Sequence, residues 1–263
     1  MKKALLIFSF LLVFYNSEAQ KWGAEMTIGY NWLKPMGEMK ERIDRADGIN
    51  MEFFMNSPNK RYSLGLEVCF ANYGAVDFPV MFNNAEVVTQ KDVRIYSQIY
   101  NTFLTGRYYL KTEGPFLPYV SLKAGFSCFA TSLQVEKEDG GDFFCMSDVE
   151  VEDLHCSGTF AMSLGGGVKA DLSYIFQKLK SQSLLLDFSC SYIGGGSVTY
   201  LNPSAPRITS DDIVKEVRYN KYVQTDQGTV HVNNIGNIHN SMARMLDFRI
   251  GICVRMAGWK CKS

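Results

Sequence analysis

The sequence predicts an all-β fold: an eight-stranded antiparallel up-and-down barrel that crosses a membrane. Two observations lead to this prediction. Segments of about ten residues alternate apolar with polar side chains, and the gaps between these segments are alternately short and long. A soluble β-sandwich has no reason to sort its connections by length in this way.

The last segment shows the alternation most clearly. A strand turns successive side chains to opposite faces, so one face suits hydrocarbon and the other a polar lumen. The apolar face carries Leu246, Phe248, Ile250, Ile252, Val254 and Met256, and the opposite face carries Asp247, Arg249, Gly251, Cys253 and Arg255.

The N-terminus predicts export. Lys2 and Lys3 precede an apolar run from Ala4 to Tyr15, and Ser17-Glu18-Ala19 resembles a cleavage site before Gln20. The run is shorter than the roughly 20 residues that a transmembrane helix needs. We therefore expect a signal peptide over 1–19 and one barrel domain over 20–263.

Charge and hydropathy exclude some classes of protein. The chain has 27 basic and 27 acidic residues, a balance that argues against a nucleic-acid partner. No later segment offers 18 consecutive apolar residues. An exported chain of this kind is either secreted or an outer-membrane barrel, and the strand pattern favours the barrel.

Eight strands account for the alternating segments. Their expected ranges are Lys21 to Leu33, Gly48 to Met55, Arg61 to Asn72, Ile95 to Leu110, Leu117 to Leu133, Ser157 to Phe176, Ser183 to Tyr200 and Arg244 to Met256.

The connections predict sidedness. Short gaps at 56–60, 111–116 and 177–182 indicate periplasmic turns, and long gaps at 34–47, 73–94, 134–156 and 201–243 indicate extracellular loops. An even number of strands then leaves both termini in the periplasm. In the longest loop, Thr209 and Asp212 favour a short helix and the segment 223–232 favours a hairpin, so partner binding is expected there.

The alternation also predicts which side chains face lipid. The fourth strand stays ambiguous, because Ile99 and Phe103 lie opposite Tyr100 and Leu104. Aromatic residues near strand ends suit interfacial girdles; they are Trp22, Trp32, Tyr62, Tyr108, Tyr119, Tyr174 and Tyr200. The lipid-facing set is Met26, Ile28, Tyr30, Trp32, Ile49, Met51, Phe53, Met55, Leu64, Leu66, Val68, Phe70, Val120, Leu122, Ala124, Phe126, Met162, Leu164, Val168, Leu172, Leu184, Leu186, Phe188 and Tyr192.

The inward positions predict a filled, ion-paired lumen. Eight strands enclose just enough room for side chains, and buried charges must be paired. Six acids and five bases form this expected network: Glu25, Glu52, Glu67, Asp171, Asp187 and Asp247 with Arg107, Lys123, Lys169, Arg249 and Arg255.

With these features, the chain resembles the small outer-membrane β-barrels of the OmpA/OmpX type. Gly29-Tyr30-Asn31-Trp32 and the Ala-Gln junction resemble Bacteroidetes-type members. The resemblance implies a non-enzymatic protein of the Gram-negative outer membrane, inserted by the barrel-assembly machinery, surrounded by lipid and binding a surface or envelope partner through its loops. One departure is that family members commonly end on an aromatic residue, whereas Met256 precedes Ala-Gly-Trp-Lys-Cys-Lys-Ser.

Alternative functions remain open at this stage. Small barrels that resemble this one include enzymes that modify the acyl chains of lipid A with a histidine and a serine or acid. His155 with Ser157 and Asp153, or His239 with Ser241, suit that chemistry by residue type. A small pore is a further alternative, and a soluble lipocalin-like binder would need an apolar lumen.

Metal and cofactor chemistry is not expected. The acidic run over 136–153 lacks the spacing of a calcium loop, and no cysteine or histidine cluster has the spacing of a zinc site. Seven cysteines in an exported chain allow a disulfide, and Cys145 and Cys156 bracket part of the acidic loop as one candidate pair.

Overall fold

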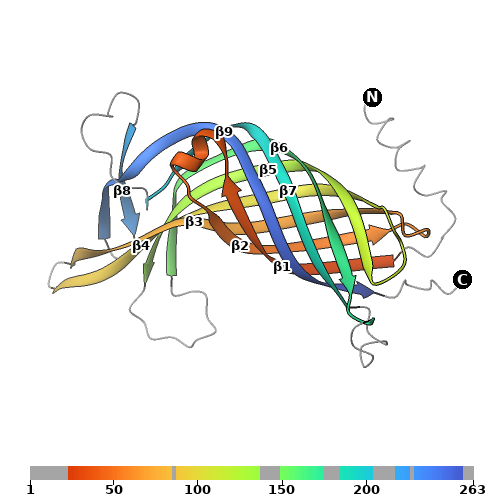
Figure 1. Cartoon of the computed structure of the whole chain (residues 1–263). Helices are drawn as coiled ribbons and strands as arrows, with labels where there is room; N and C mark the ends of the chain where they lie inside the picture. The colour runs from red at the N-terminus through yellow and green to blue at the C-terminus, as the bar shows by residue number, and fades with distance from the viewer. Residues whose placement is uncertain are drawn as a thin grey trace, which may run out of the picture.

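The chain folds into a closed antiparallel β-barrel, which confirms the predicted fold class (Figure 1). The computed structural model describes residues 23–84, 87–136, 149–174, 184–203, 217–225 and 228–256. Its elements are β1 (Gly23–Pro35), the 3-10 helix η1 (Gly37–Glu41), β2 (Ala46–Asn56), β3 (Tyr62–Asn84), β4 (Val87–Tyr109), β5 (Phe116–Glu136), β6 (Val149–Asp171), β7 (Leu184–Leu201), β8 (Val217–Thr225) and β9 (Gly228–Met256).

Eight of the described strands form the barrel wall. Each strand from β1 to β6 pairs with the next, β7 pairs with β9, and β9 pairs back with β1 to close the sheet. The remaining described strand, β8, pairs with β9 beyond the wall, where Thr225 lies opposite Gly228. This pairing is the hairpin that the sequence predicts over 223–232.

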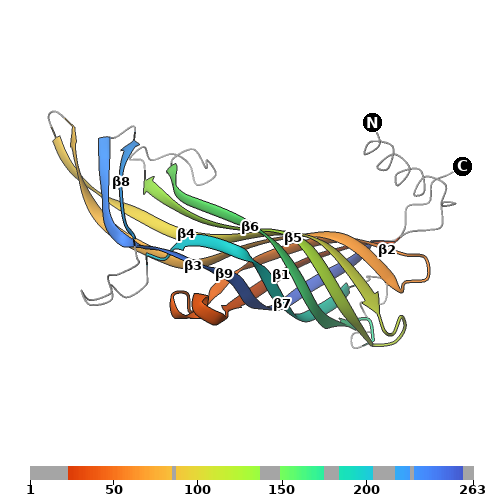
Figure 2. The same cartoon turned by 90° about the horizontal axis from the view of Figure 1, so that it is seen from above.

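The two ends of the barrel differ. The turn end holds the start of β1, the end of β9 and the connections 57–61 and 110–115. The hairpin end holds η1 and the extensions of β3, β4, β5, β6, β8 and β9, which project beyond the wall (Figures 1 and 2). No helix among the described residues is long and apolar enough to cross a membrane.

The extensions correct the expectation of long irregular loops. Most of 73–94 continues as a paired ladder of β3 with β4, most of 134–156 belongs to β5 and β6, and much of 201–243 belongs to β8 and β9. The physical reason is that these segments hold β-branched residues that suit strands, such as Val87 and Val93. Opposite charges add to it, because Arg94 Nε donates to Asp77 Oδ1 at 2.6 Å across the pair.

The side chains expected to face lipid are exposed or half-buried throughout, as an outward orientation requires, although Leu172 lies in the turn after β6. On β4, Ile99 and Phe103 point inward and are fully buried, while Leu104 is 57% exposed. Two girdle assignments are wrong: Tyr119 and Tyr200 face the interior and are buried. Trp22, the signal segment 1–19 and the expected helix at 209–212 lie outside the described residues.

Candidate functional site

The barrel interior carries a network of buried ion pairs in its half nearer the turn end. Ten of the eleven charged residues expected in the lumen take part, five acids with five bases. They are Glu25, Glu52, Glu67, Asp187 and Asp247 with Arg107, Lys123, Lys169, Arg249 and Arg255.

Arg107 of β4 links two carboxylates across the interior. Its Nη2 donates to Glu52 Oε2 at 2.8 Å and its Nη1 to Asp187 Oδ2 at 3.2 Å. Two aromatic rings flank the guanidinium, with the Phe54 centroid at 4.0 Å and the Tyr119 centroid at 4.6 Å. The Tyr119 hydroxyl also donates to Asp187 Oδ1 at 2.7 Å. The cation is therefore held by charge and by ring faces together.

Glycines on the neighbouring strands make room for these rings. A Cβ on Gly65 would lie 2.5 Å from Phe54 Cδ1, and a Cβ on Gly167 would lie 2.6 Å from Tyr119 Cζ. Both rings therefore lie flat over strand positions that have no side chain. Residue type alone gives no signal for this pairing, and the sequence reading missed Phe54 and Tyr119 as interior residues.

Arg249 of β9 is the centre of the second group. It pairs with Glu52 at 3.0 Å and also with Glu67 and Asp247. Lys123 of β5 neutralises the same carboxylates, at 3.0 Å from Glu67 and 3.8 Å from Asp247. Each carboxylate thus meets two cations, which compensates the loss of water on burial.

A third group lies nearest the turn end. Lys169 of β6 pairs with Glu25 of β1, and Arg255 Nε lies 2.9 Å from Glu25 Oε1. Asp171 is the eleventh expected residue and lies apart from these pairs: its Oδ1 accepts a hydrogen bond from the Ser173 backbone N–H at 2.9 Å. Asp171 therefore caps the turn after β6.

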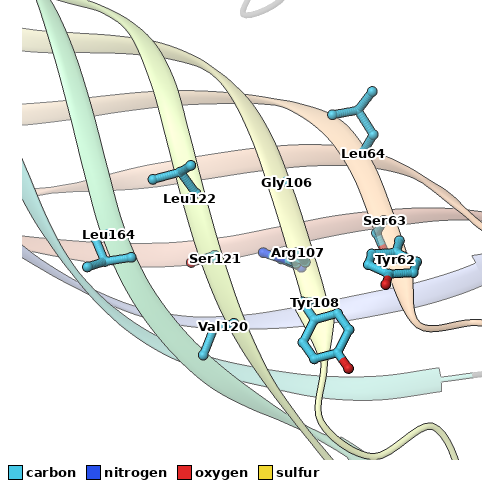
Figure 3. A pocket seen from close by; sticks show the side chains of 10 residues that line it. All are labelled: Tyr62, Ser63, Leu64, Gly106, Arg107, Tyr108, Val120, Ser121, Leu122 and Leu164. Atoms are coloured by element: carbon cyan, nitrogen blue, oxygen red, sulfur yellow. The ribbon is translucent and has the colours of Figure 1, made fainter.

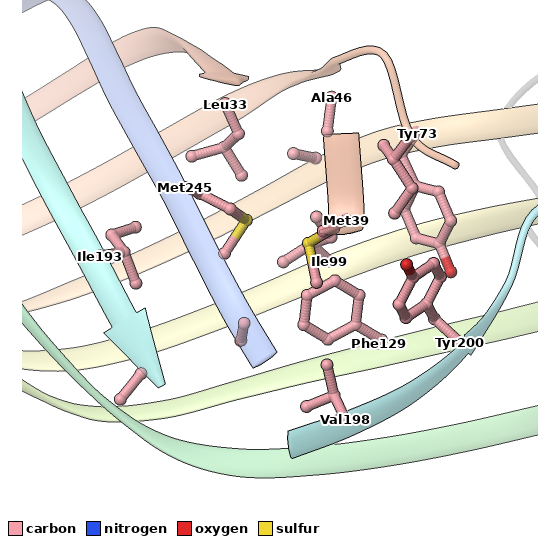
Figure 4. Packing of buried hydrophobic residues seen from close by; sticks show 14 of the residues in the cluster. Leu33, Met39, Ala46, Tyr73, Ile99, Phe129, Ile193, Val198, Tyr200 and Met245 are labelled. Carbon is pink, nitrogen blue, oxygen red and sulfur yellow. The ribbon is translucent and has the colours of Figure 1, made fainter. Parts of the chain in front are cut away.

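An apolar layer fills the half of the interior nearer the hairpin end (Figure 4). The 3-10 helix after β1 packs into this layer, because Met39 and Ile43 are fully buried and Asn202 Nδ2 donates to Arg42 O at 2.6 Å. The layer consists of Leu33, Met39, Ile43, Ala46, Cys69, Ala71, Tyr73, Ile99, Phe103, Phe129, Ala161, Ile193, Val198, Tyr200, Ala243 and Met245.

This layer modifies the expectation of a purely charged lumen. The sequence reading placed polar groups inside every strand and left Ile99 and Phe103 unassigned. The sequence does contain one indication of the apolar layer, because both faces of the fourth strand are apolar. This pattern is typical of a strand that contacts protein on one side and lipid on the other.

The outer face of the wall is an apolar belt. On β4 the belt runs over 100–108, which matches the about 9 to 11 tilted residues that cross a hydrocarbon layer. Aromatic pairs mark its two borders: Tyr62 with Tyr108 at 5.3 Å toward the turn end, and Phe70 with Tyr100 at 5.6 Å toward the hairpin end. Beyond the second border the surface becomes polar, where Gln98 Nε2 donates to Asn72 Oδ1 at 2.7 Å.

One shallow hollow interrupts the belt on β3, β4 and β5. Its volume is about 420 Å³, and it lies over Gly106, which presents no side chain between Leu64, Leu122 and Tyr108 (Figure 3). Arg107, although part of the lining, extends to the other side of the wall (Figure 3). The hollow is therefore an apolar recess in the lipid-facing surface.

The first histidine candidate for acyl-chain chemistry, His155, lies among hydrogen bonds that join neighbouring strands. His155 Nε2 lies 3.1 Å from Thr199 Oγ1, and the Thr199 backbone N–H donates to Ser157 Oγ at 3.2 Å. Asp153 Oδ1 accepts a hydrogen bond from Ser132 Oγ at 2.8 Å. These contacts connect β6 to β7 and β5 at the hairpin end.

The second histidine lies inside the barrel wall. His239 is buried, and its ring centroid is 5.7 Å from that of Tyr200. Ser241 Oγ donates to the Tyr200 hydroxyl at 3.3 Å. His239 and Ser241 therefore both contact Tyr200.

Metal ligands do not cluster in the described part of the chain: no group of three or more His, Cys, Asp or Glu side chains there has a metal-binding arrangement. Of the expected disulfide partners, Cys156 is exposed on β6, and Cys145 lies outside the described residues.

Comparison with known proteins finds similarity at the level of solved structures alone. No protein-family model matches the sequence, and no curated protein matches it. Solved structures of outer-membrane barrels are similar in fold. Neisserial surface protein A is 11% identical over 89% of this chain and 97% of its own, with a TM-score of 0.40.

Two further structures show the same kind of likeness. The attachment invasion locus protein Ail of Yersinia pestis is 10% identical over 90% of this chain and 99% of its own, with a TM-score of 0.40. A major outer membrane protein from Thermus thermophilus is 11% identical over 89% and 99%, with a TM-score of 0.45. The likeness concerns the fold alone.

Proposed function

We propose that this protein is a non-enzymatic integral barrel of the Gram-negative outer membrane, with the turn end in the periplasm and the hairpin end outside the cell. The observation that carries the proposal is the inverted distribution of side chains. Leu164 and Phe126, two large apolar residues, are 67% and 66% exposed on the outside, while Lys169 and Glu67 are fully buried inside. Water would disfavour the exposed apolar side chains, whereas a hydrocarbon layer around the belt favours them. The buried charges are compensated by their ion-pair partners inside the barrel.

The filled interior supports a barrel that conducts little. Ion pairs occupy the half near the turn end, and the apolar layer with η1 occupies the other half. Two successive barriers of opposite polarity leave an ion no continuous hydrated path. A pore is accordingly not the proposed function.

The extended strands support a role in display. β3 and β4 pair over Asp77↔Arg94 and continue to Asn84↔Val87, far beyond the polar border at Asn72. Paired strands are more rigid than an irregular loop, so they would present a stable binding site to a partner on the cell surface or in the envelope. The proposal includes how the protein reaches the membrane. The predicted signal peptide would direct export, the barrel-assembly machinery would insert the barrel, and lipid would surround it.

Epitope insertion in whole cells tests the sidedness and the display together. A tag inserted after Asn84, between β3 and β4, should be detected by antibody on intact cells. A matched tag inserted after Pro58, in the short connection between β2 and β3, should be detected only after the outer membrane is permeabilised. Detection of the second tag, and not the first, on intact cells would reverse the proposed orientation.

Purified protein in planar bilayers tests the filled interior. We expect no unit current steps at voltages where a porin added to the same bilayer gives them. Steps of uniform size from the folded protein, as judged by heat-modifiable migration in gels, would contradict a display protein with a closed lumen.

A further inference from the structure

Two cysteines on adjacent strands meet on the outer face of the barrel. Cys128 of β5 and Cys156 of β6 have their Sγ atoms 3.0 Å apart. In the ladder, Cys128 lies opposite Gly158 and Cys156 opposite Ala130, so the two cysteines are diagonal neighbours on the same face. Neither side chain is enclosed, since Cys128 is half-buried and Cys156 exposed.

The pair lies at the border between the apolar belt and the polar extension. One row toward the turn end, Phe126 and Phe160 stack edge to face at 5.8 Å on the same two strands. Cys128 itself is level with Tyr100 of β4, and Cys156 lies a row farther toward the hairpin end. Cys156 therefore lies outside the apolar belt, on the polar part of the surface.

We propose that Cys128 and Cys156 form a disulfide after export. The reaction takes place in the periplasm, before the barrel is inserted into the membrane. The Cys156 thiolate attacks the disulfide of a periplasmic dithiol–disulfide oxidoreductase and forms a mixed disulfide, which releases one oxidant thiol. The Cys128 thiolate then attacks the Cys156 sulfur and releases the second oxidant thiol. Two thiols of the barrel lose two electrons to the oxidant, whose disulfide becomes a dithiol that takes up the two protons.

The geometry favours this pairing with little movement. A disulfide has an S–S length of about 2.05 Å, so the two sulfur atoms need to approach by about 1 Å. Rotation about the Cα–Cβ bond of each cysteine moves its Sγ atom on an open face, which allows that approach without a shift of the buried network.

The bond would join β5 to β6 where their ladder is irregular. The register shifts between Thr131 and Ser132, just beyond the pair toward the hairpin end. A covalent link between 128 and 156 closes a loop that contains the projecting ends of both strands and 137–148. Closing a loop of this length restricts the unfolded chain and fixes the base of the projection.

This inference replaces the expected Cys145–Cys156 pair with a different partner for Cys156. It is independent of the proposed display function, because an enzyme or a pore with this wall would contain the same pair. The buried Cys69 and Cys253 and the exposed Cys190 stay as thiols.

Peptide mapping of the full-length protein tests the bond. The protein is exported in a Gram-negative host, and the outer membranes are quenched with acid. Their proteins are dissolved in denaturant at neutral pH with iodoacetamide, which alkylates free thiols, and the unreduced digest is analysed by mass spectrometry. We expect a cross-linked peptide pair that contains Cys128 and Cys156 and that disappears on reduction. Iodoacetamide adducts on both residues, or a Cys145–Cys156 peptide pair, would overturn the proposal.

Matched variants separate the bond from general effects on folding. Cys128→Ser and Cys156→Ser should each lose the cross-linked pair, whereas Cys145→Ser and Cys190→Ser should retain it. All four should keep heat-modifiable migration, because serine is close to cysteine in size and because Cys128, Cys156 and Cys190 are exposed or half-buried. Loss of the 128–156 peptide pair in Cys145→Ser would overturn the proposal as well.

Discussion

Arg107 of β4 donates to Glu52 of β2 at 2.8 Å although β3 separates their strands in the sheet. The contact therefore crosses the interior and does not run along the wall. Contacts of this kind connect non-neighbouring strands throughout the ion network, as Lys169 of β6 with Glu25 of β1 also shows. The wall and its filling stabilise each other.

Removing the Arg107 charge should destabilise the barrel strongly. Arg107→Met removes the cation that pairs with Asp187 and leaves Glu52 paired with Arg249. We expect a loss of about 3–5 kcal/mol in unfolding free energy, because an uncompensated charge stays buried. Urea unfolding of the wild type and the variant in lipid vesicles measures this difference in unfolding free energy.

The double variant Arg107→Met/Asp187→Leu is the control for that prediction, since it removes the uncompensated charge as well. It should recover part of the lost stability. Equal destabilisation of the single and double variants would show that the ion pair is not the cause.

Alanine at Gly167 should disrupt the interior, and alanine at Gly106 should not. A Cβ on Gly167 would meet Phe188 O at 2.4 Å and the Tyr119 ring at 2.6 Å, whereas a Cβ on Gly106 would meet only Leu122 O at 3.9 Å. Gly106→Ala fills the outer hollow and should fold normally. Heat-modifiable migration and urea midpoints of the two variants check the contrast; equal midpoints would contradict it.

The apolar layer should depend on Phe129. This side chain is fully buried with rings of Tyr73 and Tyr200 at 6.2 Å and 5.9 Å, and Phe129→Ala should cost about 3–5 kcal/mol. Phe126, three positions earlier on the same strand, faces outward, so Phe126→Ala should cost clearly less. A larger loss for Phe126→Ala in vesicle unfolding would argue against an interior apolar layer.

A charge in the middle of the belt should be costly. Leu104 lies midway along the 100–108 stretch and is 57% exposed, so Leu104→Arg should lower the unfolding free energy in lipid by about 2–4 kcal/mol. Leu110→Arg, in the connection after β4, should cost no more than about 1 kcal/mol. The same cost at both positions would mean that no hydrocarbon layer surrounds Leu104.

Much of the fold follows from local pattern, because period-two alternation fixes which face each side chain takes. Glu25, Glu52, Lys123 and Arg249 could be placed inside in this way. Their partners could not, because contacts across a barrel depend on the stagger between strands, which no local pattern encodes.

The errors have different origins. Tyr119 near a strand end suits a membrane girdle by residue type, but it alternates with the outward Val120 and therefore points inward, where Gly167 on the next strand provides space for its ring. Phe103 and Leu104 are both apolar, so alternation could not assign β4. Strand extensions such as Asp77 opposite Arg94 depend on pairing with a distant segment, which composition does not reveal.

Fluorescence quenching of Trp32 tests the outward apolar face most directly. Trp32 is 41% exposed on β1 and stacks at 5.5 Å on Phe248, while Trp22 and Trp259 can be replaced by Phe to leave it as the single tryptophan. In vesicles of lipids with brominated acyl chains, we expect strong quenching of Trp32 and protection from acrylamide. Strong acrylamide quenching with no effect of the bromine atoms would contradict a membrane-spanning barrel.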